Sequence, residues 1–251
     1  MLSKNDIKYY SSLLQKKFRR EYGKFLVEGR KLVIEAFNSG FECEIIISTN
    51  KFNESNPDIL DSADLRKVRW ETVKQMEFDK LTDTKSPQGI IGIFKIPSKT
   101  KISSKGNIVV ALESISDPGN LGTILRNCDW FGIQNVILNE SCAEIFNPKV
   151  IRASAGSVFH LKIYESKNFI DSITELKNKG FKIVTADLNG ENIYEYDRNE
   201  KSIIVFANEA NGPSMEVLSV SDSKITIPQK GKAESLNVAS ASAVILSEMT
   251  K

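Results

Sequence analysis

Short apolar runs alternate with longer amphipathic segments along the second part of this 251-residue chain. Runs of about four to eight apolar residues between turn residues are typical of buried strands, and apolar residues spaced three and four apart are typical of helices. Strands that alternate with helices form a parallel sheet covered on both faces. The pattern predicts strands at 108–112, 135–138, 160–164, 181–186, 202–206 and 224–227, with helices at 121–131, 148–155, 169–179, 214–218 and 238–249.

The first hundred residues show a smaller alternation of the same kind. It predicts strands at 24–27, 44–48, 66–70 and 88–95, with helices at 30–38 and 73–81. A polar stretch without aromatic residues, Pro-Ser-Lys-Thr-Lys-Ile-Ser-Ser-Lys-Gly, then interrupts the pattern and is typical of a linker. We therefore predict an α/β protein with a domain at 1–97, a linker at 98–106 and a second domain at 107–251.

Composition bounds the class of protein. Hydrophobic residues make up 41% and charged residues 26%, as in soluble globular proteins. No apolar run approaches the ~20 residues of a membrane helix, and the N-terminus lacks the apolar core of a signal peptide. The three cysteines lack metal-ligand spacing, which favours buried free thiols in a reducing compartment. We expect a cytoplasmic protein with neither a metal site nor a membrane partner.

The positive charge of the chain is concentrated at its N-terminus. The formal net charge is only +2, yet residues 1–31 carry nine basic and three acidic side chains, which leaves −4 for the remaining 220 residues. Apolar residues at helical spacing predict an amphipathic helix here, with the basic side chains on its outer face. Such a face is either merely solvated or binds phosphates. The candidate RNA-binding residues are Lys16, Lys17, Arg19, Arg20 and Arg30.

Several common α/β enzyme classes lack their signature in this sequence. No two of the 14 glycines are two positions apart, so the dinucleotide fingerprint G-x-G-x-x-G is absent. There is no P-loop motif. The chain has one histidine, which rules out the H-E-x-x-H zinc motif and most Ser-His-Asp arrangements.

Three stretches of the second domain carry the strongest functional signal. They read Asp-Pro-Gly-Asn-Leu-Gly-(three residues)-Arg from Asp117, Asn-Glu-(two residues)-Gly from Asn208, and Ile-Pro-(six residues)-Ser-Leu-Asn-Val from Ile227. In this order they resemble the three motifs of the SpoU (TrmH) family of RNA ribose 2′-O-methyltransferases, within the SPOUT superfamily. Residues 25–29 and 86–89 of the first domain resemble the L30e-like RNA-recognition domain that precedes many members.

The resemblance implies a fold, a cofactor and a set of site residues. It implies an α/β-knot, in which the final helix passes through a loop near the second motif, and a homodimer that uses S-adenosylmethionine. The implied catalytic residues are Asn120, Arg126, Glu209, Ser235 and Asn237. The implied cofactor-binding residues are Ala207, Asn208, Gly212, Ile227 and Leu236. Ala207 is a departure, because the family usually has glycine there and a methyl group narrows the approach of the backbone to a ligand.

The motifs leave parts of the chemistry open. Arg126 is suited to binding a phosphate in a bidentate manner. The acceptor of the 2′-hydroxyl proton is one of three alternatives: Arg126, an RNA phosphate or water. Glu209 is placed to orient Asn120, Arg126 or Ser235. Ribosomal RNA is the favoured substrate and transfer RNA the alternative. A further alternative is an inactive, methyltransferase-like RNA-binding module, which calorimetry with S-adenosylmethionine distinguishes from an enzyme.

Overall fold

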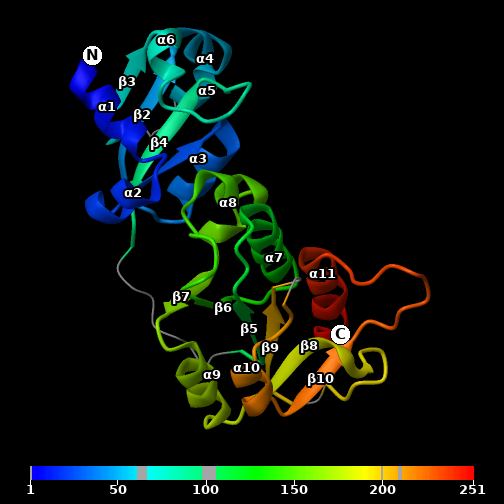
Figure 1. Ribbon diagram of the computed structural model, residues 1–251. Coiled ribbons are helices and arrows are strands. Elements are labelled where there is room, and N and C mark those ends of the chain that lie inside the picture. Colours follow the sequence, from blue (N-terminus) through cyan, green and yellow to red (C-terminus); the bar gives the residue numbers. More distant parts are fainter. Residues whose placement is uncertain (1, 61–66, 98–105, 199, 209–210) are drawn as a thin grey trace. The chain divides into compact units, whose positions relative to one another are not determined.

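The computed structural model describes residues 2–60, 67–97, 106–198, 200–208 and 211–251 (Figure 1). The chain divides into two compact units. One comprises Met1–Ser98 with Phe146–Arg152, and the other comprises Lys99–Ile145 with Ala153–Lys251. The predicted linker lies outside the described residues except for Gly106. Within the described part of the chain, no helix is both long and apolar enough to cross a membrane.

The first unit contains a four-stranded mixed sheet in the order β1-β4-β2-β3. Two pairs, β1–β4 and β4–β2, are antiparallel, and β2–β3 is parallel. Its strands are β1 (Lys24–Glu28), β2 (Cys43–Thr49), β3 (Trp70–Val73) and β4 (Ile90–Lys95). Its helices are α1 (Lys4–Ser12), α2 (Lys16–Tyr22), α3 (Arg30–Asn38), α4 (Asn50–Ser55), α5 (Pro57–Leu60) and α6 (Gln75–Phe78).

The predicted N-terminal helix is in fact two helices, α1 and α2. A capping box starts α1: the Ser3 hydroxyl accepts from the Asp6 N–H at 3.1 Å, and the Asp6 carboxylate accepts from the Ser3 N–H at 2.8 Å. The break falls at residues 13–15, where the buried Arg19 donates Nη1–H to the Leu13 carbonyl at 2.7 Å. This bond fixes the corner between the two helices.

Two further predictions for the first unit need correction. The strand predicted at 66–70 is β3, which starts only at Trp70, because the parallel pairing with β2 runs from Ile46 opposite Trp70 to Thr49 opposite Val73. The helix predicted at 73–81 is the single turn α6. The sequence analysis also missed α4, whose start is capped by the Thr49 side chain.

The second unit contains the predicted parallel sheet, in the order β10-β8-β9-β5-β6-β7, and its neighbouring strands are parallel. The strands are β5 (Ile108–Glu113), β6 (Asn135–Asn139), β7 (Lys162–Ser166), β8 (Lys182–Asn192), β9 (Ser202–Ala207) and β10 (Ser223–Thr226). Its helices are α7 (Pro118–Trp130), η2 (Ser157–Phe159), α9 (Phe169–Lys177), α10 (Met215–Val220) and α11 (Val238–Met249). Helix α8 (Pro148–Ala153) lies almost wholly in Phe146–Arg152, the segment that belongs to the first unit.

Helices cover both faces of this sheet, which explains why the central strands β5 and β9 are buried except at their ends. Val109 and Ala111 of β5 pack with Ile203 and Val205 of β9 beneath α9 and α10. The alternate residues point to the other face, which is covered by α7 and α11 (Figure 1). The sequence therefore predicted the layers correctly; the threading of α11 stays a prediction.

Three elements of the second unit begin or end away from their predicted positions. The strand predicted at 160–164 is β7, which starts at Lys162 because His160 ends the 3-10 turn η2. The strand β8 continues to Asn192 and pairs with β10 through a register shift. At that shift Gly190 approaches the Ile225 backbone so closely that a Cβ would lie 2.5 Å from it. Helix α7 starts at Pro118, three residues before its predicted start.

Candidate active site

The three motif stretches follow β5, β9 and β10 and therefore meet the sheet at its carboxyl edge. The strands β5 and β9 are neighbours near the centre, and the chain runs outward from them in both directions. In open α/β sheets this reversal of strand order marks the crevice where nucleotide-like ligands bind. The fold thus brings the motifs to the edge that such a ligand requires.

The first motif begins as a helix start. The Asp117 side chain is the N-cap of α7 and accepts from the Asn120 N–H at 2.8 Å, with Pro118 at the first helical position. Asn120, which directly precedes the helix predicted at 121–131, accordingly lies in the first turn of α7. The Asp-Pro pair is explained by helix capping, whereas the Asn120 side chain is left for another role.

Asn237 joins the third motif to the first. Its Nδ2 donates to Asn120 Oδ1 at 2.9 Å, although the two residues are 117 positions apart. Its Oδ1 caps α11 by accepting from the N–H groups of Ala239 at 3.0 Å and Ser240 at 3.3 Å. Next to this link, Asn127 Nδ2 donates to the Ala239 carbonyl at 3.0 Å and to Ser242 Oγ at 2.9 Å. The start of α11 is thus fixed against one side of α7.

The other predicted catalytic residues lie at the surface or outside the described residues. Arg126 is exposed on α7, beside the asparagine that contacts α11. Ser235 is exposed in the segment before α11. Glu209 belongs to the residues that the structure does not describe. Asn120 and Asn237 are therefore the pair of predicted catalytic residues joined by a described side-chain bond.

The second motif is tied to the end of β5. Asn208 Nδ2 donates to the Ser114 carbonyl at 3.2 Å, and the Gly212 N–H returns to the Asn208 carbonyl at 2.9 Å. Gly212 has φ +64°, a conformation that favours glycine. Beyond it the Ser214 N–H donates to Glu113 Oε2 at 3.0 Å, and the Ser214 hydroxyl caps α10. The predicted cofactor residues Asn208 and Gly212 are thus bonded to each other and, through Asn208, to Ser114 just after β5.

Sequence reasoning missed the residues that shape the chain just after β5. Ser114 has φ +58°, which is uncommon for a residue other than glycine. Asn139, the last residue of β6, holds it by accepting from the Ser114 N–H at 2.9 Å, and Cys142 donates its thiol to the Leu112 carbonyl at 3.3 Å. Backbone strain of this kind gathers at functional sites. A polar residue at the carboxyl end of a buried strand was the available signal.

The remaining predicted cofactor residues give this edge an apolar surface. Ala207 ends β9 opposite Glu113 and is half-buried, and Ile227 directly follows β10 and is also half-buried. Leu236 precedes the α11 cap and is 50% exposed. An uncovered leucine among polar loop residues suits the flat apolar face of a nucleoside, because ligand sites combine apolar walls with a few polar groups. These residues fit S-adenosylmethionine.

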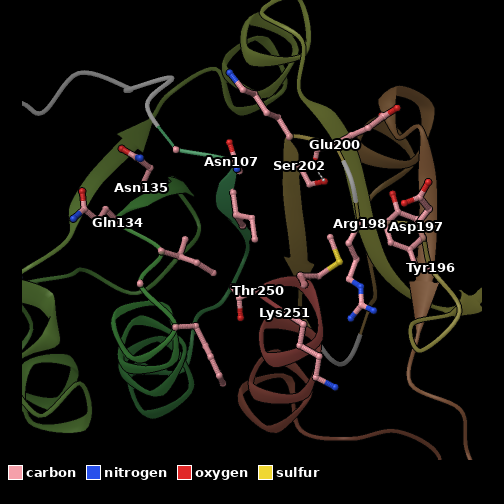
Figure 2. Close-up of a pocket in the computed structure, with 17 residues that line it drawn as sticks. Asn107, Gln134, Asn135, Tyr196, Asp197, Arg198, Glu200, Ser202, Thr250 and Lys251 are labelled. Atoms are coloured by element: carbon pink, nitrogen blue, oxygen red, sulfur yellow. Dashed lines mark hydrogen bonds between the residues drawn. The ribbon is translucent and has the colours of Figure 1, made fainter.

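A hollow lies at the opposite edge of the same sheet (Figure 2). Its volume is about 900 Å³. Its lining includes Asn107, Asn135 and Ser202 at the first positions of β6 and β9, and Thr250 and Lys251, which follow α11. Arg198 on its wall bonds to the Glu248 carbonyl at 2.7 Å. Since ligands of parallel sheets bind at the carboxyl ends, we do not assign the active site to this hollow.

The predicted RNA-binding residues divide by exposure. Lys16, Lys17 and Arg20 are exposed on α2. Arg30 is exposed but pairs with Asp58, with Nη2 and Oδ2 2.5 Å apart. Arg19 is 2% exposed and bonds to a carbonyl of its own chain. A buried guanidinium with this partner does not reach a phosphate, so the prediction for Arg19 needs correction: it holds the α1–α2 corner.

The fold is an α/β architecture whose parallel sheet carries the three motif stretches at its carboxyl edge. Residues 107–247 match the SpoU rRNA Methylase family, and residues 4–92 match the MRM3-like substrate binding domain. The chain belongs to the SpoU rRNA methylase family, as the three motifs predicted.

Known proteins resemble the chain over nearly its full length. It is 32% identical to the 23S rRNA (guanosine(2553)-2′-O)-methyltransferase RlmP of Bacillus subtilis, covering 96% of this chain and 94% of that one. A putative RNA methyltransferase of the TrmH family from Porphyromonas gingivalis superposes with a TM-score of 0.86 at 33% identity, over 99% and 98% of the two chains. An AdoMet-bound rRNA methyltransferase from Sinorhizobium meliloti gives 0.86 at 28% identity, over 99% and 96%.

Proposed function

We propose that this protein transfers a methyl group from S-adenosylmethionine to a ribose 2′-hydroxyl of ribosomal RNA. The observation that carries the proposal is the bond between Asn237 and Asn120, since it unites the first and third motifs at the carboxyl edge of the sheet. Family membership, the ribosomal RNA substrate of the Bacillus subtilis relative and the AdoMet-bound Sinorhizobium meliloti structure support it.

In this proposal the residues of this chain position the cofactor and the target ribose. The bound cofactor supplies an electrophilic methyl group, and Ala207, Ile227 and Leu236 hold its nucleoside. Arg126 is exposed on the helix that carries Asn120 and clamps the phosphate beside the target ribose, since a guanidinium binds phosphate in a bidentate manner. Holding two reactants in contact accounts for much of the rate of such a displacement.

Asn237 and Asn120 have a supporting role in this scheme. Asn237 uses its acceptor for the α11 cap and one donor for Asn120, so its orientation is fixed at both ends. A fixed Asn120 presents its own amide N–H groups in one direction. The proton of the 2′-hydroxyl passes to an RNA phosphate or water, because a guanidinium stays protonated at neutral pH.

The finer parts of the proposal concern assembly and compartment. The second unit leaves large apolar side chains exposed, among them Trp130 at 80% and Leu188 at 69%. Exposed apolar side chains of this size favour burial against a second copy, so we include a homodimer in the proposal. The free cysteines Cys43, Cys128 and Cys142 suit the reducing cytoplasm.

Mapping 2′-O-methyl groups in the RNA of cells with and without the protein tests the proposal. It predicts that one ribose methyl group disappears from ribosomal RNA and returns on expression of the wild-type chain. Loss of a mark from transfer RNA instead would assign the alternative substrate. Unchanged marks in both RNAs, together with no binding of S-adenosylmethionine in calorimetry, would favour the inactive RNA-binding module.

A further inference from the structure

Aromatic side chains of α1 and α2, two helices that follow one another in the first unit (Figure 1), form a row of neighbouring rings. Tyr10 and Tyr9 have ring centroids 5.1 Å apart, Tyr9 and Tyr22 4.8 Å, and Tyr22 and Phe18 5.8 Å. The row starts in the core, where Tyr10 is 5% exposed, and runs outward to Phe18. We call Tyr10, Tyr9, Tyr22 and Phe18 the aromatic row.

The outer end of the row combines a flat ring with positive charge. Phe18 and Tyr22 lie four residues apart on α2 and stack at an interplanar angle of 25°. Both are partly exposed. The Lys17 ammonium lies 5.6 Å from the Phe18 ring centroid, and Lys16 and Arg20 are exposed on the same short helix. An aromatic face next to cationic side chains has the composition of single-stranded RNA sites, where bases stack on rings and phosphates meet cations.

The row is held in place before any ligand arrives. Arg19 fixes the α1–α2 corner through its bond to the Leu13 carbonyl. Lys24 donates to Tyr9 Oη at 3.0 Å and lies over the Tyr9 ring, while it also pairs with Glu44 of β2. Tyr9 and Tyr22 pack on the core of the unit. A preformed platform binds with little loss of side-chain freedom, because its rotamers are already set.

We infer that the outer end of the aromatic row, Phe18 with Tyr22, is a stacking site for an unpaired base of the RNA substrate, with Lys16, Lys17 and Arg20 contacting the adjoining phosphates. The inference rests on the proposed function for the identity of the RNA. It adds that the first unit selects single-stranded or looped RNA over a paired helix, because bases in a duplex do not offer a free face to a protein ring.

The test uses the full-length protein and a short single-stranded RNA that carries the fluorescent base 2-aminopurine at one position at a time. Stacking on Phe18 quenches the fluorescence at one position, and Phe18→Leu removes that quenching. Base stacking contributes about 1–3 kcal/mol, so Phe18→Leu weakens binding about 5- to 150-fold. Phe18→Tyr keeps a ring and restores affinity. Phe37→Leu, a partly exposed phenylalanine on α3, is the matched control and leaves affinity unchanged.

Salt dependence separates stacking from phosphate contact. Phe18→Leu leaves the slope of log affinity against log salt unchanged. Lys16→Gln makes this slope shallower by about 0.7, the value for one phosphate contact with a single strand. An RNA with one abasic nucleotide keeps its phosphates, and it reproduces the loss of affinity without changing the protein. This measurement holds even if Phe18→Leu lowers the stability of the unit.

Three results would overturn the inference: equal affinity of Phe18→Leu and wild type, abasic RNAs that all bind like the parent strand, or a paired duplex bound as tightly as the single strand. Failure of the proposed function is a separate result, because it shows as no methyl transfer by a wild-type protein that still distinguishes the abasic RNA.

Discussion

The Asn237 side chain donates to Asn120 Oδ1 at 2.9 Å while its own Oδ1 caps α11. Asn237→Asp separates these two duties, because aspartate caps a helix as well as asparagine but its carboxylate has no N–H to donate. We expect Asn237→Asp to unfold at the wild-type denaturant midpoint and to lose most methyl transfer. Asn237→Ala should lose activity and also about 0.5–2 kcal/mol of unfolding free energy. Near-normal turnover of Asn237→Asp would show that the N–H donor of Asn237 is dispensable.

Arg126 is exposed on α7, so its replacement removes a site group without disturbing the core. Arg126→Ala should abolish methyl transfer, keep S-adenosylmethionine binding in calorimetry, and change the unfolding free energy by no more than about 0.5 kcal/mol. Lys179→Ala, which removes an exposed cation after α9, is the control and should remain active. Turnover by Arg126→Ala close to that of the control would refute the catalytic assignment.

Ala207 stands where the family usually has glycine, at the end of β9. If its methyl group crowds the cofactor, Ala207→Gly should tighten S-adenosylmethionine binding by up to about 1 kcal/mol, the scale of Gly/Ala effects. Titration calorimetry measures the difference. Weaker binding by the glycine variant would mean that the backbone has adapted to alanine.

Burial raises the pKa of the Cys142 thiol to about 11, from 9.0. A raised thiol pKa favours the protonated form in the folded state, so this contribution to stability is complete below pH 9 and is lost as the pH rises toward 11. Cys142→Ser keeps a donor for the Leu112 carbonyl but does not titrate in this range. We expect the wild type to lose more unfolding free energy than Cys142→Ser between pH 9 and 11. Parallel pH profiles would contradict the burial of this thiol.

A fragment of residues 106–251 tests whether the second domain binds the cofactor by itself while the first unit contributes to RNA binding. It should fold and bind S-adenosylmethionine, since the three motifs lie within it, and should bind RNA more weakly with a shallower salt slope. Residues 146–152 belong to the first unit, where the ring centroids of Phe146 and Phe25 lie 4.3 Å apart. The fragment lacks Phe25, so the ring of Phe146 loses this contact. Phe146→Ser should therefore raise the solubility of the fragment. Equal RNA affinity and slope for fragment and full chain would exclude the first unit as the docking element.

Much of this fold followed from the sequence because hydrophobic periodicity reports burial directly. The strands β5 and β9 are apolar apart from Glu113 and Ser202 at their ends, a pattern typical of strands covered on both faces, and the helix α11 starts at Val238 as predicted. The errors arose where pairing or capping outweighs periodicity. Helix α7 starts at Pro118, earlier than predicted, because Asp117 caps it. Strand β3 starts at Trp70, later than predicted, because its pairing with β2 begins there.

The candidate site was predictable as a list of residues but less so as an arrangement. The motifs named Asn120 and Asn237, yet no local pattern predicts a bond across 117 positions. Ser114 and Asn139 were missed because their role depends on a backbone angle and on two strands lying side by side. The prediction that Arg19 binds RNA was wrong because a basic residue in a basic segment is expected to be exposed. The corner between α1 and α2 instead buries the Arg19 side chain.

Methyl transfer by the purified protein tests the central claim most directly. Ribosomal RNA from cells lacking the protein is incubated with S-adenosylmethionine carrying an isotopically labelled methyl group, digested to nucleosides and analysed by mass spectrometry. The account predicts label on the ribose 2′-oxygen of one nucleotide with the wild-type chain and none with Arg126→Ala. Label on a base, or no label from a wild-type protein that binds both S-adenosylmethionine and the RNA, would contradict it.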